Sequence, residues 1–212
     1  MKSRRNFIKK TAALTVGAGT LIGFPHNSLA ARSSQQTVNG INIVGPKEGY
    51  TPEIGTLVSM MAWMRNTMLR PVYGMSQADL DYLIDEEANS IGAMLMHLVA
   101  TERFYQRNTF TDGKHFEPGR AEDNMYDAAS NLGDAGRKEF KGKELDYYLE
   151  KLADCREFSL KEMATYEDGW LEVVDTQFWG SPTNNYCKWF HVAEHESNHN
   201  GQIKFLKSRL PS

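Results

Sequence analysis

The 212-residue sequence lacks apolar stretches of the ~20 residues that a membrane-spanning helix needs, apart from one mild run near its start. We therefore expect no stable membrane insertion once that N-terminal segment is removed. Internal repeats and convincing strand-like runs are also missing, whereas segments with helical periodicity are plentiful. These absences favour one all-α domain over a repeat array or a β fold.

Cysteine is scarce, with only Cys155 and Cys187 in the chain. We expect these two residues on antiparallel neighbouring helices, on the order of 10 Å apart along the helix axes at ~1.5 Å rise per residue. That separation exceeds the ~7 Å between Cα atoms that a disulfide tolerates. Two free thiols are therefore predicted, even in an oxidising compartment.

Basic residues are in deficit over most of the chain. The full sequence has 24 Lys and Arg against 27 Asp and Glu, but five of the basic residues and none of the acidic ones fall in the first thirty positions. Subtracting those five leaves 19 basic residues against 27 acidic ones, a net charge of -8. Proteins bind the phosphate backbone of nucleic acids mainly through Lys and Arg side chains, so no nucleic-acid partner is expected.

The N-terminal segment is typical of a twin-arginine export signal. Arg4 and Arg5 are followed by Phe7, then by the apolar run from Thr11 to Phe24, and then by small residues suited to cleavage. An ordinary secretory signal or an uncleaved anchor is the alternative interpretation. We predict a signal peptide at residues 1–30, a polar linker at 31–50, and a periplasmic or otherwise exported protein.

Four helical segments are predicted within a domain at residues 51–210. Thr51 and Pro52 are suited to begin the first helix, and Ser76 with Asp79 forms a capping-box-like start for the second. The Gly-, Asp- and Asn-rich stretch from about 108 to 141 predicts a long crossover between the second and third helices. The expected fold is an all-α four-helix bundle. Its helices span about 52–70, 76–104 with a break that resumes through Ile84 and Ala88, 143–168, and a last helix capped by Ser181 or Thr183 that ends near 209.

The last helix carries three of the five histidines that follow residue 30, His191, His195 and His199. Residues four apart lie on one helix face within ~5–6 Å at Cβ, so His195 and His199 can bind one ion together. Each step of four turns the side chain by about 40°, so three such histidines rarely share one ion. His97, at the edge of the second helix's apolar stripe, is the candidate for the third ligand.

These segments resemble the metal-site signature of the DinB/YfiT-like superfamily. The second helix contains His97-Leu98 with Glu102 five residues after the histidine, and the last helix contains His191-Val192, His195, and His199 with Gly201-Gln202-Ile203. The resemblance implies that His97, His195 and His199 are the metal ligands and that His191 is a neighbour outside them. It also implies a four-helix bundle over about residues 50–210, with a homodimer as a family-level expectation.

Three neutral imidazoles suit Zn, Ni or Fe, and three protein ligands leave positions open for exchange. The resemblance implies a metal-dependent S-transferase or hydrolase that acts on a small molecule, possibly a thiol. Glu102 and His191 are the candidate proton-handling catalytic residues, although a surface salt bridge is the plainer expectation for Glu102. The alternative function is a metal-binding module without catalysis. A di-iron protein would need a second Glu-x-x-His motif besides the one from Glu196 to His199, and the position three before His97 is Met94.

Overall fold

The computed structural model describes residues 40–110 and 121–211. The predicted signal peptide at 1–30 and the first part of the predicted linker lie outside these residues. The described residues belong to one compact unit. Within the described ranges the chain is mostly helical, which confirms the all-α prediction.

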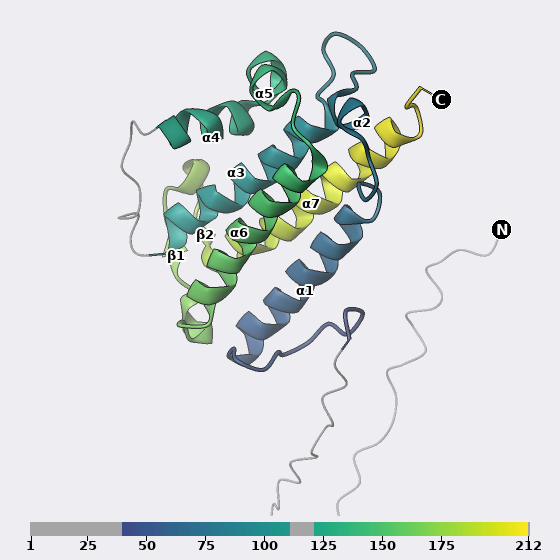
Figure 1. Cartoon of the computed structure of the whole chain (residues 1–212). Coiled ribbons are helices and arrows are strands. Elements are labelled where there is room, and N and C mark those ends of the chain that lie inside the picture. The colour runs from purple at the N-terminus through teal and green to yellow at the C-terminus, as the bar shows by residue number, and fades with distance from the viewer. Residues whose placement is uncertain (1–39, 111–120, 212) are drawn as a thin grey trace, which may run out of the picture. The chain divides into compact units, whose positions relative to one another are not determined.

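Four long helices lie side by side in Figure 1, and their mutual contacts position everything that follows. In chain order, the first of these helices packs on the fourth, the fourth packs on the second, and the second packs on the third. Their apolar core forms two clusters, one that includes Leu95 and Tyr148 and another that includes Leu57 and Trp189. The four helices are α1 (Pro52–Leu69), α3 (Ile91–Thr109), α6 (Leu145–Met163) and α7 (Asn185–Lys207).

The predicted second helix is in fact two separate helices, each with its own N-cap residue. Ser76 forms the expected capping box with Asp79, but the helix that it starts, α2 (Gln77–Asp81), is short. The chain re-enters a helix only at Ile91, after Ser90 accepts a hydrogen bond from the Ala93 amide as the N-cap of α3. Ile84 and Ala88 therefore lie in a connecting segment, and the prediction that placed them on the resumed helix is wrong.

The long crossover between α3 and α6 contains two further helices, α4 (Ala121–Asn131) and α5 (Gly133–Phe140). Both pack on α3. The α6 helix ends five residues earlier than predicted, at Met163, before the 3₁₀ turn η4 (Asp168–Trp170). A minimal antiparallel pair, β1 (Val174–Asp175) and β2 (Thr183–Asn184), then leads into α7. Between these strands lies a second 3₁₀ turn, η5 (Phe178–Gly180).

The last helix starts with a different cap from the one predicted. The Asn184 side chain accepts a hydrogen bond from the Cys187 amide at 2.9 Å, so Asn184 is the N-cap rather than Ser181 or Thr183. Asparagine is as good an N-cap as serine, so residue type alone does not separate Asn184 from Ser181 or Thr183. None of the helices in the described ranges is long and apolar enough to cross a membrane.

Candidate metal centre

His97 is held by the crossover segment. Its Nδ1 atom lies 2.9 Å from the carbonyl oxygen of Ala129 on α4. A carbonyl can only accept a hydrogen bond, so Nδ1 carries the proton and Nε2 keeps its lone pair. That lone pair points toward α7, because Nε2 lies 2.8 Å from Nε2 of His195. A backbone carbonyl that fixes the tautomer of a histidine in this way is a common feature of metal sites.

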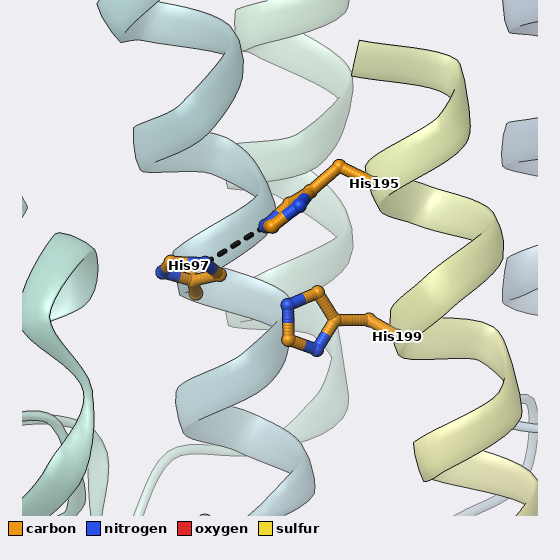
Figure 2. Close-up of side chains that lie close together, drawn as sticks. All are labelled: His97, His195 and His199. Carbon is orange, nitrogen blue, oxygen red and sulfur yellow. Dashed lines mark hydrogen bonds between the residues drawn. The ribbon is translucent and has the colours of Figure 1, made fainter. Parts of the chain in front are cut away.

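The three predicted ligand histidines converge from two helices, His97 from α3 and His195 and His199 from α7, as Figure 2 shows. The ring centroids of His97 lie 4.9 Å from His195 and 5.0 Å from His199, and those of His195 and His199 lie 4.7 Å apart. One ring nitrogen from each residue lies within 4.8 Å of the other two. Two nitrogens bound at ~2.1 Å to one tetrahedral ion are about 3.4 Å apart, so this spread suits a single cation.

All three imidazoles are kept neutral by their surroundings. Burial, together with the neighbouring His199, His97 and His191, lowers the pKa of His195 to about 3. Burial and the neighbouring His97 lower the pKa of His199 to about 4, and burial also lowers the pKa of His97. Neutral imidazole is the form that binds a metal.

The chemistry of the donor set tests whether the residues fit a cation. Only 5 % of His199 is exposed. Figure 2 shows one nitrogen of its ring facing His97 and His195. With three neutral nitrogens converging, the donor set fits a divalent transition metal.

Glu102, a candidate proton-handling residue in the sequence, does not belong to this cluster. Five residues separate it from His97, which turns its side chain by about 140° around α3. It is fully buried, and both of its carboxylate oxygens accept hydrogen bonds from Arg156 while Ser159 donates to one of them. The plainer expectation, a surface salt bridge, is wrong because the ion pair is internal.

His191 lies next to the three converging histidines, and with Glu194 and His195 it forms a second group whose ligand atoms lie within 4.8 Å of one another. Its ring centroid is 5.1 Å from that of His195. Its Nδ1 shares a hydrogen bond of 2.7 Å with the hydroxyl of Tyr105, a residue that sequence reasoning did not select. Burial raises the pKa of Tyr105, so its hydroxyl stays protonated. His191, His97 and His195 line one pocket of about 270 Å³.

A comparison with known protein families matches residues 56–211 to the mycothiol-S-transferase family, which is part of the DinB/YfiT-like superfamily. The chain belongs to the mycothiol-S-transferase family. This confirms the predicted superfamily, and the matched range includes every residue of the histidine cluster. A comparison with curated proteins found no match.

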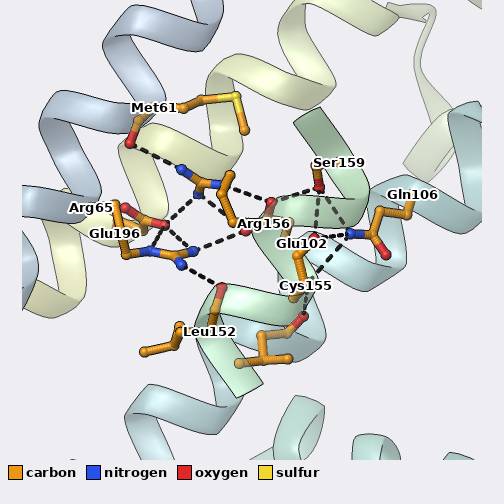
Figure 3. A network of polar contacts seen from close by, with 10 residues as sticks. Met61, Arg65, Glu102, Gln106, Leu152, Cys155, Arg156, Ser159 and Glu196 are labelled. Atoms are coloured by element: carbon orange, nitrogen blue, oxygen red, sulfur yellow. Dashed lines mark hydrogen bonds and ion pairs between the residues drawn. The ribbon is translucent and has the colours of Figure 1, made fainter. Parts of the chain in front are cut away.

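This mycothiol-S-transferase family member also has a buried charge network that sequence reasoning missed. Each of the four long helices contributes one charged side chain to it, and all four side chains are almost completely buried. Two positive and two negative charges balance, as a stable buried network requires. Figure 3 shows the network, whose charged members are Arg65 on α1, Glu102 on α3, Arg156 on α6 and Glu196 on α7.

Both arginines join the two helices that carry the histidines. Arg65 donates to Glu196 of α7 through Nε at 2.8 Å and to Glu102 of α3 through Nη2 at 2.9 Å. Arg156 donates to Glu102 through Nε at 2.7 Å and to Glu196 through Nη2 at 2.8 Å. The network therefore fixes α3 and α7 relative to each other. It also occupies Glu196, the carboxylate of the one Glu-x-x-His motif in the chain.

Both cysteines are free, as predicted. Cys155 is buried on α6, where burial and the nearby Glu102 raise the pKa of its thiol. Cys187 is exposed near the start of α7. Neither residue is among the groups that could hold a metal in the described part of the chain.

Proposed function

We propose that the chain is a four-helix bundle that binds one divalent metal ion through His97, His195 and His199 and catalyses transfer of a thiol sulfur to a small-molecule acceptor. The observation that carries this proposal is the convergence of three neutral imidazoles, within 4.8 Å of one another, in a chain of the mycothiol-S-transferase family. Zn, Ni and Fe all suit imidazole ligands. The family's printed name supplies the thiol as the substrate class.

When bound, the divalent ion would supply Lewis acidity that favours the ionised form of a thiol near neutral pH. The protein's own part begins with holding the three ligands. The Ala129 carbonyl fixes the tautomer of His97, and the Arg65 and Arg156 network holds α3 against α7. These contacts orient the ligands before any substrate arrives, and such preorganisation lowers the cost of reaching the reactive geometry.

In the transfer step, the thiolate sulfur forms a bond to an electrophilic carbon of the acceptor, and the leaving group departs from that carbon with the bonding electron pair. The thiol proton needs a base near the cluster. His191 lines the same pocket as His97 and His195, and its hydrogen bond with Tyr105 orients the ring. We assign His191 the proton-handling role and Tyr105 the role of positioning it.

The test uses metal-free protein reconstituted separately with Zn, Ni, Fe(II) or Co(II). Mycothiol and other low-molecular-weight thiols are offered with a halogenated acceptor, and halide release is measured. The proposal expects turnover with at least one metal and none with metal-free protein or with His199→Ala. Tight metal binding without turnover for any thiol or hydrolysable ester would contradict the catalytic part and leave a metal-binding module. Absence of metal binding would overturn the whole proposal.

Export is proposed on the sequence alone, from the paired Arg4 and Arg5 before the apolar run. The twin-arginine route carries folded cargo, which is compatible with a metal loaded before transport. The test is cell fractionation of the wild type beside the variant with Arg4→Lys and Arg5→Lys. The wild type is expected in the periplasm or medium and the variant in the cytoplasm, whereas export of both to the same extent would contradict a twin-arginine signal.

A further inference from the structure

The pocket that His97, His191 and His195 line also has aromatic side chains beside the imidazoles. Phe104 and Tyr105 of α3 and Trp179 of η5 line it, together with His97, His191 and His195. Besides the imidazoles, its lining residues carry the hydroxyls of Tyr105, Thr101 and Ser130 and the indole N–H of Trp179. None of the residues that line it, within the described part of the chain, carries a Lys, Arg, Asp or Glu side chain. Apart from a cation held by His97 and His195, the pocket therefore has no fixed charge with which to recognise an ionic group.

Trp179 has two unfavourable features at once. Its backbone lies in the left-handed region, at φ 51° and ψ 32°, although it is not a glycine. Its indole is also 72 % exposed, the largest exposed fraction among the large hydrophobic side chains of the described residues. A strained backbone conformation that presents a large apolar side chain to solvent is typical of a binding site.

The position of Trp179 is nevertheless fixed. The paired strands β1 and β2 close the loop that carries it, and the preceding Phe178 is buried with its ring 6.0 Å from that of Tyr105. The indole stacks on Phe104 at a centroid distance of 6.0 Å and an interplanar angle of 14°, and it meets the ring of His191 nearly at right angles, also at 6.0 Å. It forms a fixed aromatic surface beside the residues that would hold the metal.

We propose that this aromatic pocket binds a planar apolar group, such as a substituted benzene ring, which packs against Trp179 and Phe104. The assignment of this group to the acceptor molecule rests on the proposed S-transferase function. The binding of a planar apolar group to the pocket does not depend on that function. Low-molecular-weight biological thiols carry many charged or hydroxyl groups, and an uncharged aromatic pocket would leave those groups without partners. The pocket volume of about 270 Å³ is near the lower end for ligand sites, which suits one or two rings.

The experiment compares two probes of similar size, benzyl alcohol and cyclohexylmethanol, by ligand-detected NMR with the full-length protein, both metal-free and metal-loaded. The variants are Trp179→Ala, Trp179→Phe, and Trp63→Ala as a control on another partly exposed indole, on α1. Metal content, oligomeric state and thermal unfolding are measured for each variant, so that a folding defect is recognised.

We expect wild type and Trp63→Ala to bind benzyl alcohol at least about fivefold more tightly than cyclohexylmethanol. Trp179→Ala should abolish this preference, and Trp179→Phe should retain most of it. Equal binding of the two probes, or an unchanged preference in Trp179→Ala, would overturn the aromatic pocket. So would a change in Trp179→Ala confined to oligomeric state, which would make the indole a subunit contact. Binding to metal-free protein keeps this outcome separate from failure of the metal or transferase proposal.

Discussion

The Nε2 atom of His97 lies 2.8 Å from the Nε2 atom of His195, although 98 positions separate the two residues in the sequence. This contact requires α3 and α7 to pack with their histidine faces together. It also requires α4 to supply the carbonyl that fixes the His97 ring. The distance between these two Nε2 atoms therefore depends on the correct packing of α3, α4 and α7. Both atoms belong to proposed metal ligands.

Removing the base beside the pocket should slow the reaction without removing the metal. His191→Ala is expected to lower turnover by on the order of 10²-fold, the lower end of general acid–base effects. Tyr105→Phe, which loses only the hydroxyl that hydrogen-bonds His191, should give a smaller decrease. The measurements are steady-state kinetics and metal content. Loss of metal in either variant would show that these residues support the ligands instead of handling a proton.

Glu102→Gln should destabilise the protein because it breaks the network that holds α3 against α7. Removing one member of a buried ion network leaves the arginines uncompensated, at a cost of about 3–5 kcal/mol in the free energy of unfolding. Glu150→Gln, an exposed position on α6, is the control and should have little effect. Urea unfolding at pH 7 measures the difference. A Glu102→Gln protein that is as stable as the wild type but has lost turnover would point to the proton-handling role predicted from the sequence.

The same substitution gives a pH dependence with a definite sign. Burial raises the pKa of Glu102, but the charges of Arg156 and Arg65 and their hydrogen bonds outweigh burial and lower it below the ordinary value. The carboxylate therefore contributes stability that is fully present above the ordinary glutamate pKa and is lost as the pH falls through the lowered one. The difference between wild type and Glu102→Gln should shrink at acidic pH. A difference that grows in acid would contradict the assignment.

Part of the fold and site could be predicted from the sequence because local spacing determines it. His195 and His199 share a helix face by their separation of four, and Ser76 with Asp79 signals a helix start directly. Glu102 lies outside the histidine cluster because a separation of five turns a side chain to another face. The Ala129 carbonyl that holds His97 has no side-chain signal, so only the tertiary structure identifies it.

The buried charge network did leave a signal in the sequence that spacing could have revealed. Its charged residues continue the apolar stripe of each helix at intervals of three or four, as Arg65 follows Met61 and Glu196 follows Val192. A charge at such a position on each of four helices, two of each sign, indicates an internal network. Which carboxylate meets which guanidinium depends on helix packing, which spacing does not determine.

Gly92 is predicted to be necessary for the approach of α6 to α3. A Cβ atom added there would lie 2.4 Å from the hydroxyl oxygen of the buried Tyr148, which donates a hydrogen bond to the Phe140 carbonyl. Gly92→Ala should therefore destabilise the protein by about 1–3 kcal/mol. Gly201→Ala is the matched control on α7, where nothing lies within 4 Å, and should stabilise by roughly 0.5–1 kcal/mol. Thermal or urea unfolding of both variants checks this, and equal effects would refute the packing argument.

The two cysteines should differ sharply in reactivity. Cys187 is exposed, whereas Cys155 is buried and its thiol pKa is raised, so only Cys187 should react rapidly with an aromatic disulfide reagent under native conditions. One cysteine thiol per chain should react quickly, and the second should react only after the protein is unfolded. Cys187→Ser should remove the fast phase, and a fast phase that persists would mean that Cys155 is accessible.

The central claim, one divalent ion held by His97, His195 and His199, is tested most directly by metal content. Wild type, His97→Ala and His191→Ala are purified, loaded with Zn or Co(II), freed of excess metal and analysed by mass spectrometry. Wild type and His191→Ala are predicted to retain about one ion per chain, and His97→Ala to lose most of it. Unchanged metal content in His97→Ala, or no retained ion in the wild type, would contradict the three-histidine site.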